Sequence, residues 1–229
     1  MSMIIDGVDF QGLPAERYWQ WPSGYKKNKQ DEIYAMIMSN AYIGSRKMDG
    51  AYYRFIKDMN GNMVLQGRSE SVNGGFLDKI DWVPHLHSFF DALPRGTCLL
   101  GEIYFPNNEG SRHVTTIMGC LPEKARERQE KGKKLHYYVF DVWAWAGASL
   151  LSVTAETRFS QLGYVSECVA RADNKFIEIA KYYYGQALWD ELMRVRMLDG
   201  EGIVITKSNS HAEPGKRTAR KTLKIKKEL

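Results

Sequence analysis

The chain has 229 residues, a net charge of +5, 44% hydrophobic residues and 26% charged residues. That length is typical of one domain, or of one large domain with appendages, and the composition excludes a chain that is disordered throughout. No apolar run approaches the roughly 18 residues of a membrane span. The N-terminus lacks the basic flank and apolar stretch of a secretory signal, so membrane and secreted proteins are both disfavoured.

The three cysteines, Cys98, Cys120 and Cys168, are far apart and odd in number, and none forms a C-x-x-C pair. This pattern indicates neither a disulfide scaffold nor a zinc site. A reducing compartment is the simplest interpretation, so we expect a cytoplasmic protein, in a bacterial or a virus-infected host cell.

Positive charge is concentrated at the C-terminal end. Residues 207–229 hold eight lysines and arginines against two glutamates, a net charge of +6, which exceeds the net charge of the whole chain. A basic cluster of this kind indicates a phosphate-rich partner such as a nucleic acid. The alternative is a solvated surface with no partner.

Hydrophobic periodicity and turn residues predict the following elements in chain order: a helix over Lys29–Ala41, strands over Ala51–Ile56 and Asn62–Gln66, a strand over Cys98–Phe105, a polar surface helix or loop over Pro122–Gly132, a strand over Leu135–Trp143, one long helix over Asn174–Met197, and short strands over Gly202–Thr206 and Thr222–Ile225. Asn60-Gly61 is a strong hairpin signal between the first two strands. Strands in hairpin order with helices between groups of them predict an α+β fold, with antiparallel sheets flanked by helices.

The first candidate for chemistry is Lys47-Met48-Asp49-Gly50, a K-x-D-G sequence between a predicted helix and a predicted strand. Alone it is short enough to occur by chance. Asp-Gly is also good turn chemistry, which would leave Lys47 as a surface lysine. The interpretation therefore depends on the motifs that follow.

Five further short motifs follow in order: Gly67-Arg68-Ser69, Gly101-Glu102-Ile103-Tyr104, Phe140-Asp141, Glu201-Gly202-Ile203-Val204-Ile205 and Lys224-Ile225-Lys226. Each could be structural by itself. Together they supply a lysine, two carboxylates on apolar strands, an aromatic strand and two lysines on one face of a strand. Those are the groups needed to bind a nucleotide with its metal and to attack its phosphate.

The order of these motifs resembles that of the covalent nucleotidyltransferases, the polynucleotide ligases and mRNA-capping enzymes. The spacing is most similar to the adenylation domain of ATP-dependent DNA ligases of viral and bacterial type. The resemblance spans Lys47 to Lys226, and six ordered motifs are far more specific than one. It implies an ATP-grasp-like nucleotidyltransferase fold, with one adenylation domain over residues 1–229.

The resemblance also implies a mechanism used in DNA replication, repair and recombination. Lys47 attacks the α-phosphate of ATP, AMP passes to the 5′-phosphate of a nick in duplex DNA, and the 3′-hydroxyl then seals the nick. A lysine nucleophile has to be neutral, although a lysine in water has a pKa of about 10.4. Bound Mg²⁺, Lys224 and Lys226 are cations that favour the neutral form, and Asp49 orients Lys47 or a metal-bound water.

The same resemblance assigns the remaining ligand contacts. Glu102 and Glu201 face the metal and the ribose, and their hard oxygen ligands suit Mg²⁺, with Mn²⁺ as an alternative. Phe140 stacks on adenine, and an aliphatic side chain of residues 203–205, Ile203 first, covers the other face of the base. The base is discriminated near Ser45 and Arg46, and Arg68 lies near the 5′-phosphate or AMP.

Three departures from the family pattern are visible. Tyr52 stands where an arginine is common, so Arg54, on the same strand face, could substitute for it. Ser45 stands where an acidic residue is frequent. An OB-fold domain follows K-x-K in the family, whereas this sequence stops three residues after Lys226. We therefore expect an adenylation domain without its OB-fold domain, which would be present in the full-length protein, and we expect a monomer.

Two other functions remain open. An RNA ligase or a capping guanylyltransferase would use the same motifs, the latter with GTP. An NAD⁺-dependent ligase is disfavoured because only 46 residues precede Lys47. A non-enzymatic nucleic-acid-binding module with a decayed site is the second alternative, and the intact motif lysines and glutamates argue against it.

Overall fold

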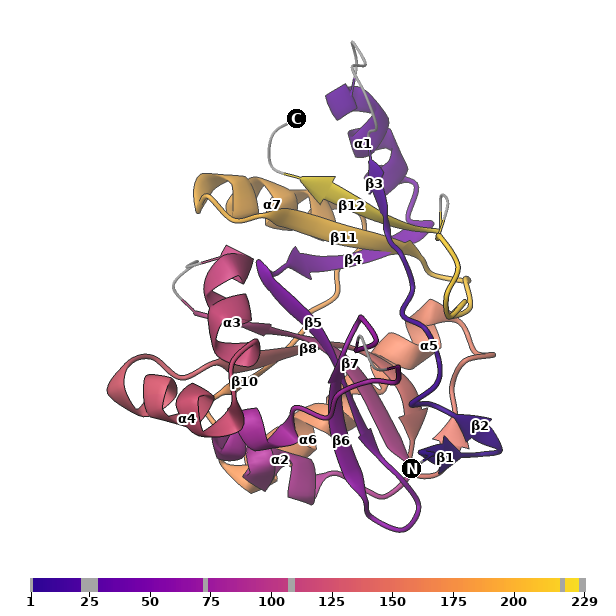
Figure 1. Cartoon of the computed structure of the whole chain (residues 1–229). Coiled ribbons are helices and arrows are strands. Elements are labelled where there is room, and N and C mark those ends of the chain that lie inside the picture. Colours follow the sequence, from indigo (N-terminus) through magenta and orange to yellow (C-terminus); the bar gives the residue numbers. More distant parts are fainter. Residues whose placement is uncertain (1, 22–28, 72–73, 107–109, 219–220, 227–229) are drawn as a thin grey trace. The chain divides into compact units, whose positions relative to one another are not determined.

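The computed structural model describes residues 2–21, 29–71, 74–106, 110–218 and 221–226. The chain divides into two compact units, each built from separate segments (Figure 1). Unit 1 comprises residues 1–14, 49–151 and 158–179, and unit 2 comprises residues 15–48, 152–157 and 180–229. The K-x-D-G motif spans a boundary, because Met48 ends a segment of unit 2 and Asp49 begins a segment of unit 1.

Unit 1 is built on one large sheet. Its strands are β5 (Gly50–Lys57), β6 (Met63–Gly67), β7 (Thr97–Tyr104), β8 (His136–Trp145), β9 (Ala148–Ser149) and β10 (Ile177–Ile179). The order is β10-β8-β7-β5-β6, with β9 paired to β8, and every pair is antiparallel except β10 with β8. The predicted hairpin is confirmed as β5 and β6, and the Asp58 carboxylate closes its turn by accepting hydrogen bonds from Asn60 and Asn62.

The helices of unit 1 are α2 (His87–Ala92), α3 (Gly110–Met118), α4 (Pro122–Lys131) and α6 (Leu162–Ala172), with short 3₁₀ turns η1 (Ile80–Trp82) and η2 (Pro84–Leu86). A small hairpin of β1 (Ile4–Ile5) and β2 (Val8–Asp9) belongs to the same unit. Helix α2 packs on α6 and on the sheet, where the rings of Phe55 and Phe90 stack with centroids 4.2 Å apart. Burial of these aromatic rings supplies much of the driving force for this core.

Unit 2 contains a four-stranded sheet in the order β3-β12-β11-β4, with β3 (Trp19–Trp21), β4 (Tyr42–Lys47), β11 (Gly202–Lys207) and β12 (Thr222–Lys226). Helices α1 (Lys29–Met38) and α7 (Gly185–Met197) pack together, and α7 also packs on β4 and β11 (Figure 1). Their shared core is a cluster of buried side chains: Ile33, Ile37, Tyr42, Leu188, Leu192, Val195, Ile203, Ile205, Leu223 and Ile225. One face of the sheet is therefore filled by apolar packing.

The α+β class and the predicted strands are confirmed, but the long helix over Asn174–Met197 is wrong. Ile177 and Ile179 belong to a strand, β10, and helix α7 starts only at Gly185. Alternating apolar residues suit a strand paired with β8, and the pairing is parallel. Gly185, the first residue of α7, has a positive φ of 47°, which most residues avoid.

Three further features of the structure concern the Pro122 segment, membrane-spanning helices and the C-terminal basic cluster. Pro122–Lys131 is a helix with proline in its first turn. Of the two structures predicted for Pro122–Gly132, a helix or a loop, the helix is confirmed. Among the described residues, no helix has both the length and the apolar character needed to cross a membrane. Part of the C-terminal basic cluster, including Arg220 and Lys227, lies outside the described residues.

Helix α5 (Ala155–Ser160) begins in unit 2 and ends in unit 1. Its hydroxyl-rich start is ordered locally, because the Thr154 and Thr157 side chains lie 3.0 Å apart and Thr157 N–H donates to the Thr154 hydroxyl. Its last turn carries Arg158, which is buried. This helix therefore brings a cation into the interior of unit 1.

The half-buried imidazole of His85 makes the stability of unit 1 depend on pH. Its Nε2 lies 2.8 Å from the Leu135 carbonyl and its ring packs edge-on against Phe176. Burial lowers the pKa of His85 from 6.5 to about 4. The unfolded chain therefore binds an extra proton between these two values, so the free energy of unfolding falls as the pH drops through that window.

We expect the free energy of unfolding of the wild-type protein, measured by urea titration, to fall as the pH is lowered from about 7 to about 5. His85 should contribute about 1–2 kcal/mol of that loss. In His85→Gln, which can still donate to Leu135, the loss should be smaller by that amount. His113→Gln, which replaces an exposed histidine of the same unit, is the control. An equal loss in wild type and His85→Gln would contradict this assignment.

Candidate active site

An ion pair at one end of the unit 2 sheet joins two of the motif residues. The Nζ of Lys47 lies 2.6 Å from Oε2 of Glu201, and both side chains are largely buried, with exposures of 12% and 25%. The pair forms because β4 ends at Lys47 where β11 begins, with Lys47 opposite Gly202 in an antiparallel register. Residues 154 positions apart in the sequence are thereby held together. Lys47 is thus the last residue of β4, a strand that was not among those predicted.

Gly202 is required for this arrangement. Its φ is +140°, and a Cβ at this position would lie 2.0 Å from the carbonyl oxygen of Ile225. Any side chain here would push β12 away from β11. The glycine of the E-G motif therefore permits the close approach of β12 to β11 next to Glu201.

The two lysines of the K-x-K motif lie on the same sheet. Lys226 is opposite Gly202, and Lys224 is opposite Val204, which in turn is opposite Ser45. Directly opposed residues share a face of a sheet, and so do residues two apart on one strand. Ser45, Lys47, Lys224 and Lys226 therefore start from one face, the one opposite the core under α7.

The same register corrects two assignments. Ile203 has no exposed surface and belongs to the apolar core on the helix side, so its assignment as a nucleotide contact is wrong. The aliphatic residue on the lysine face is Val204, which is half-buried. Arg46 is opposite Ile203, so its side chain starts from the helix side and away from Ser45 and Lys47.

Unit 1 gathers another set of predicted residues around Tyr52. Tyr52 is opposite Glu102 on β7, and Glu102 is opposite Tyr138 on β8. The ring of Phe140 lies 6.4 Å from that of Tyr52, and the Arg68 guanidinium lies 5.2 Å from the Tyr52 ring. Glu102, Phe140 and Arg68 are therefore neighbours of one tyrosine.

Tyr52 itself is a residue that sequence reasoning left without a role. The signal was available in its strand position, because a tyrosine opposite the carboxylate-bearing strand shares the face of Glu102. A guanidinium over a tyrosine ring is a favourable contact, worth about 0.5–1 kcal/mol when exposed. Tyr52 therefore serves as a platform for Arg68.

Asp49 is exposed at the start of β5 and has a structural partner. Its Oδ1 accepts a hydrogen bond of 3.2 Å from the backbone N–H of Ser111, in the first turn of α3. A carboxylate at a helix N-terminus satisfies an unpaired N–H and interacts favourably with the helix dipole. Asp49 therefore anchors α3 to the sheet. Its predicted part in orienting Lys47 stays a prediction.

Arg54 does not replace the family arginine, so that hypothesis is wrong. The side chain is only 1% exposed, and its Nη2 donates to the carbonyl of Leu13 at 2.6 Å. The guanidinium also lies 5.7 Å from the Trp143 ring. Arg54 therefore holds the N-terminal segment of unit 1 against the sheet through its Nη2 group.

The carboxylates of the motifs suit Mg²⁺ better than a metal that needs several protein ligands. Over the described part of the chain, no group of three or more His, Cys, Asp or Glu side chains could hold an ion. Mg²⁺ does not need such a group, because it is usually held by one or two carboxylates, waters and substrate phosphates. Glu201, a carboxylate on a lysine-rich face, fits that chemistry, and Glu102 offers a second carboxylate in unit 1.

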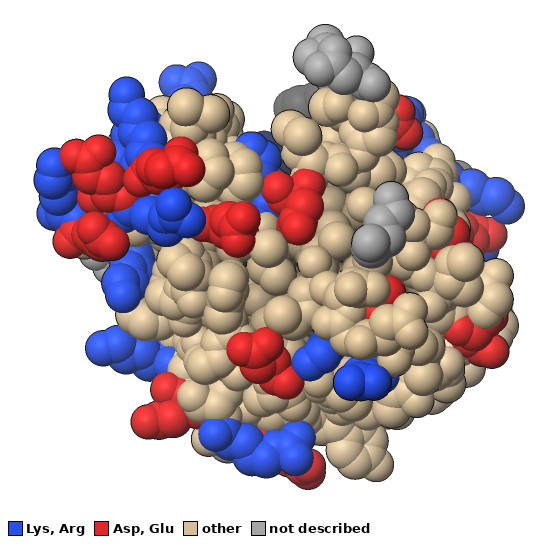
Figure 2. All heavy atoms as spheres, turned by 60° about the horizontal axis from the view of Figure 1, so that its bottom comes forward, with Lys and Arg blue, Asp and Glu red and all other residues tan. Residues whose placement is uncertain are grey.

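Charge elsewhere on the surface is mixed. Figure 2 shows positive and negative side chains interspersed on the face it presents, without one continuous field of either sign.

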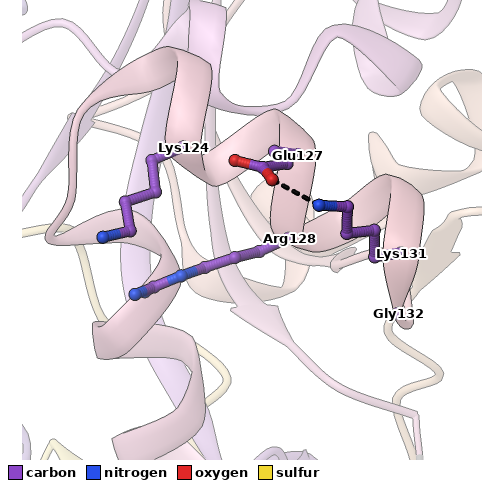
Figure 3. Close-up of a pocket in the computed structure, with 5 residues that line it drawn as sticks. All are labelled: Lys124, Glu127, Arg128, Lys131 and Gly132. Atoms are coloured by element: carbon purple, nitrogen blue, oxygen red, sulfur yellow. Dashed lines mark hydrogen bonds and ion pairs between the residues drawn. The ribbon is translucent and has the colours of Figure 1, made fainter.

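A hollow of about 370 Å³ lies along α4, lined by Lys124, Glu127, Arg128, Lys131 and Gly132 (Figure 3). An ion pair between Glu127 and Lys131 borders it. It contains no motif residue, so it is not the candidate site.

The sequence profile described as "ATP dependent DNA ligase domain" matches residues 26–226, which include all six motifs. The chain belongs to this family. In a search of curated protein sequences, no protein matches this family member.

Solved ligase structures share the fold of this ligase domain. The ligase domain of M. tuberculosis LigD has a TM-score of 0.66 at 17% identity, over 96% of this chain and 62% of that one. The bacteriophage T7 ATP-dependent DNA ligase in complex with ATP has a TM-score of 0.60 at 15% identity, over 96% and 69%. A Lig E DNA ligase has a TM-score of 0.61 at 16% identity, over 93% and 68%. The ligase domain thus spans about two thirds of each of these three structures.

Proposed function

We propose that this chain is the nucleotidyltransferase part of an ATP-dependent DNA ligase in which Lys47 accepts AMP from ATP. The observation that carries the proposal is the Lys47–Glu201 pair on the lysine face of unit 2, with Lys226 opposite the glycine that follows Glu201. These are the first, fifth and sixth motifs of the family. That the whole chain acts as one adenylation domain is part of the same proposal.

In the first step the Nζ of Lys47 attacks the α-phosphorus of ATP. An N–P bond forms, the bond to the β-phosphate oxygen breaks, pyrophosphate leaves with that electron pair, and Nζ loses its proton. A protonated amine has no lone pair for this attack, so the ion pair with Glu201 has to open first. Mg²⁺ bound with the nucleotide would neutralise phosphate charge and take the Glu201 carboxylate.

The remaining residues hold the nucleotide. Lys224 and Lys226 neutralise charge that develops on the α-phosphate, which stabilises the transition state because these cations are already in place. Phe140 stacks on the base, an interaction worth about 1–3 kcal/mol and not selective among bases. Val204 is the aliphatic residue that contacts the base, and Ser45 and the backbone around it select adenine.

Two residues of unit 1 complete the scheme. Glu102 accepts from the ribose hydroxyls and supplies the second carboxylate toward the metal. Arg68, held over Tyr52, binds the 5′-phosphate of the nick or the phosphate of AMP. An arginine suits this role because its planar donors match phosphate oxygens in a bidentate manner.

The later steps join DNA. The 5′-phosphate of a nick attacks the AMP phosphorus and releases Lys47, and the 3′-hydroxyl then attacks the activated 5′-phosphate and releases AMP. This activity would serve replication, repair and recombination of DNA in the cytoplasm, in a monomeric protein whose full-length form carries an OB-fold domain. The free thiols of Cys98, Cys120 and Cys168 support a reducing compartment.

The test compares nucleotides and substrates. The wild-type chain should become labelled by α-labelled ATP with Mg²⁺ and not by α-labelled GTP, which separates a ligase from a capping guanylyltransferase. It should then pass AMP to a 5′-phosphate in nicked duplex DNA in preference to nicked duplex RNA. Preferential labelling by GTP, or transfer to RNA alone, would overturn the proposal.

Binding to nicked duplex DNA should depend strongly on salt. Each phosphate neutralised adds about 0.9 to the slope of log K against log salt, so three contacts predict about a 40-fold loss of affinity between roughly 50 and 200 mM salt. Fluorescence anisotropy over a salt series with a labelled nicked duplex measures the slope. A slope near zero would show that the lysine face and the basic C-terminal residues do not contact phosphates.

A further inference from the structure

Phe140 sits at an irregularity in the sheet of unit 1. On β7 and β8, Leu100 is opposite Asp141 while the next residue, Gly101, is opposite Val139. Phe140 is therefore an extra residue with no Cα partner on β7, and Trp143 is another, at a second register shift where Leu99 is opposite Val142 and Cys98 is opposite Ala144. Such a β-bulge bends the strand and changes the direction of a side chain.

The bulge also changes where Asp141 lies. Leu100 and Glu102 are two apart on β7, so they share a face, and Asp141 shares it because it is opposite Leu100. In a regular strand, adjacent residues such as Phe140 and Asp141 would point to opposite faces. The extra residue thus brings Asp141 onto the face that carries Tyr52 and Glu102, directly beside Phe140.

β7, the strand that faces the bulge, packs closely against β8 at Gly101. A Cβ on Gly101 would lie 2.2 Å from the ring of Tyr137 and 2.7 Å from the carbonyl oxygen of Tyr138. The Tyr137 hydroxyl also donates to the Tyr53 carbonyl at 3.1 Å, which ties β8 to β5 across β7. β7 is therefore pressed against β8 at the residue opposite the bulge.

A buried ion pair between Asp141 of β8 and Arg158 of α5 lies next to the bulge. Nε of Arg158, on α5, lies 3.0 Å from Oδ1 and 3.3 Å from Oδ2 of Asp141, and both side chains are 3% exposed. The backbone N–H of Val142 donates to the same Oδ1 at 2.8 Å. The carboxylate is thus bonded to the residue that follows it and to a fixed cation, which leaves it little freedom.

We propose that the Asp141–Arg158 pair is a positioning device that fixes the β8 bulge and thereby holds Phe140 in place for stacking on the base of the nucleotide. This rests on the proposed function, in which Phe140 is the base-stacking residue. Asp141 and Arg158 are too deeply buried to touch the nucleotide themselves. Their effect reaches it only through Phe140.

A positioning role predicts a loss that depends on the base. Asp141→Asn keeps the shape of the side chain but removes the charge that holds Arg158. It should weaken ATP binding by about 5- to 10-fold, a part of what one stacked base contributes. Tripolyphosphate carries the same phosphates without a base, so its affinity should change less than twofold. Asp58→Asn, which removes another buried carboxylate of unit 1, is the matched control and should leave both affinities unchanged.

A double-mutant cycle separates positioning from general damage. In a Phe140→Ala background, where the stacking ring is already absent, Asp141→Asn should weaken ATP binding by less than twofold. Arg158→Lys keeps a cation near Asp141 but loses the fixed two-contact geometry, so it should fall between wild type and Asp141→Asn. It also serves as the test variant if Asp141→Asn does not fold.

Three results would overturn the proposal: an equal loss for ATP and tripolyphosphate, an undiminished effect of Asp141→Asn without Phe140, or unchanged ATP binding in Phe140→Ala. These are binding measurements, so they judge the pair whether or not Lys47 is adenylated. A wild-type protein that binds ATP through Phe140 but never forms a covalent adduct would refute the proposed function and leave the positioning role intact.

Discussion

Replacing Lys47 with alanine is expected to abolish covalent attachment of AMP, a loss of at least roughly a thousandfold, as is usual when a nucleophile is removed. Lys224 and Lys226 are the other motif lysines on the same face of the sheet, and the Nζ of Lys47 is the one that lies 2.6 Å from Oε2 of Glu201. The measurement is the intact mass of the protein after incubation with ATP and Mg²⁺. A phosphoramidate bond should release AMP in acid and keep it in alkali.

Lys47→Arg is the sharper variant. Arginine keeps the positive charge and can still pair with Glu201, so the local structure and the charge of the face are retained. It is effectively always protonated and cannot act as a nucleophile. We therefore expect Lys47→Arg to bind ATP and to remain unlabelled. An adduct that persists in either variant would place the nucleophile on another residue.

The parts of the structure that follow from local chemistry were predictable. The β5–β6 hairpin was predicted from Asn60-Gly61, and β7, β8, β11 and β12 from short β-prone or alternating runs. The shared face of Lys224 and Lys226 follows from the period of two along a strand. The family resemblance assigns Lys47 and Glu201 to one site, but it does not predict their ion pair, because sequence alone does not pair β4 with β11.

The parts that depend on tertiary packing were not predictable. Ile203 and Val204 are adjacent aliphatic residues, and only the packing of α7 on the sheet decides that Ile203 is buried and Val204 faces the lysines. The bulge at Phe140 exists only in the pairing of β8 with β7. Tyr52 and Arg54 share a face of β5, as the strand period of two predicts. The N-terminal segment that covers Arg54, however, comes from residues more than 40 positions away in the sequence.

The Lys47–Glu201 pair has two opposite consequences for adenylation. Glu201 holds the lysine in place, but an ion-paired ammonium cannot attack phosphorus. Removing the carboxylate would therefore free the amine and, under the proposed role of Glu201, also remove a ligand for Mg²⁺. The two effects can be separated, because only the second depends on the concentration of the metal ion.

Glu201→Gln keeps the size of the side chain and removes its charge. We expect adenylation at limiting Mg²⁺ to fall by about 10- to 100-fold, the usual cost of weakening a metal site, and to recover partly at high Mg²⁺. Folding should be retained, because the glutamine amide keeps the size of the side chain and its oxygen can still accept a hydrogen bond from Lys47. The measurement is the rate of AMP labelling over a Mg²⁺ series.

Glu213→Gln is the matched control for this experiment. Glu213 forms a comparable pair with Lys221 in unit 2, at 2.8 Å, and its 29% exposure is close to the 25% of Glu201. It lies outside the motifs, so its loss should not change the Mg²⁺ dependence. If Glu201→Gln were labelled like the wild type at limiting Mg²⁺, Glu201 would only position Lys47. If Glu201→Gln were labelled faster, the ion pair would slow the attack of Lys47 on ATP, and the metal would have to be held by other residues.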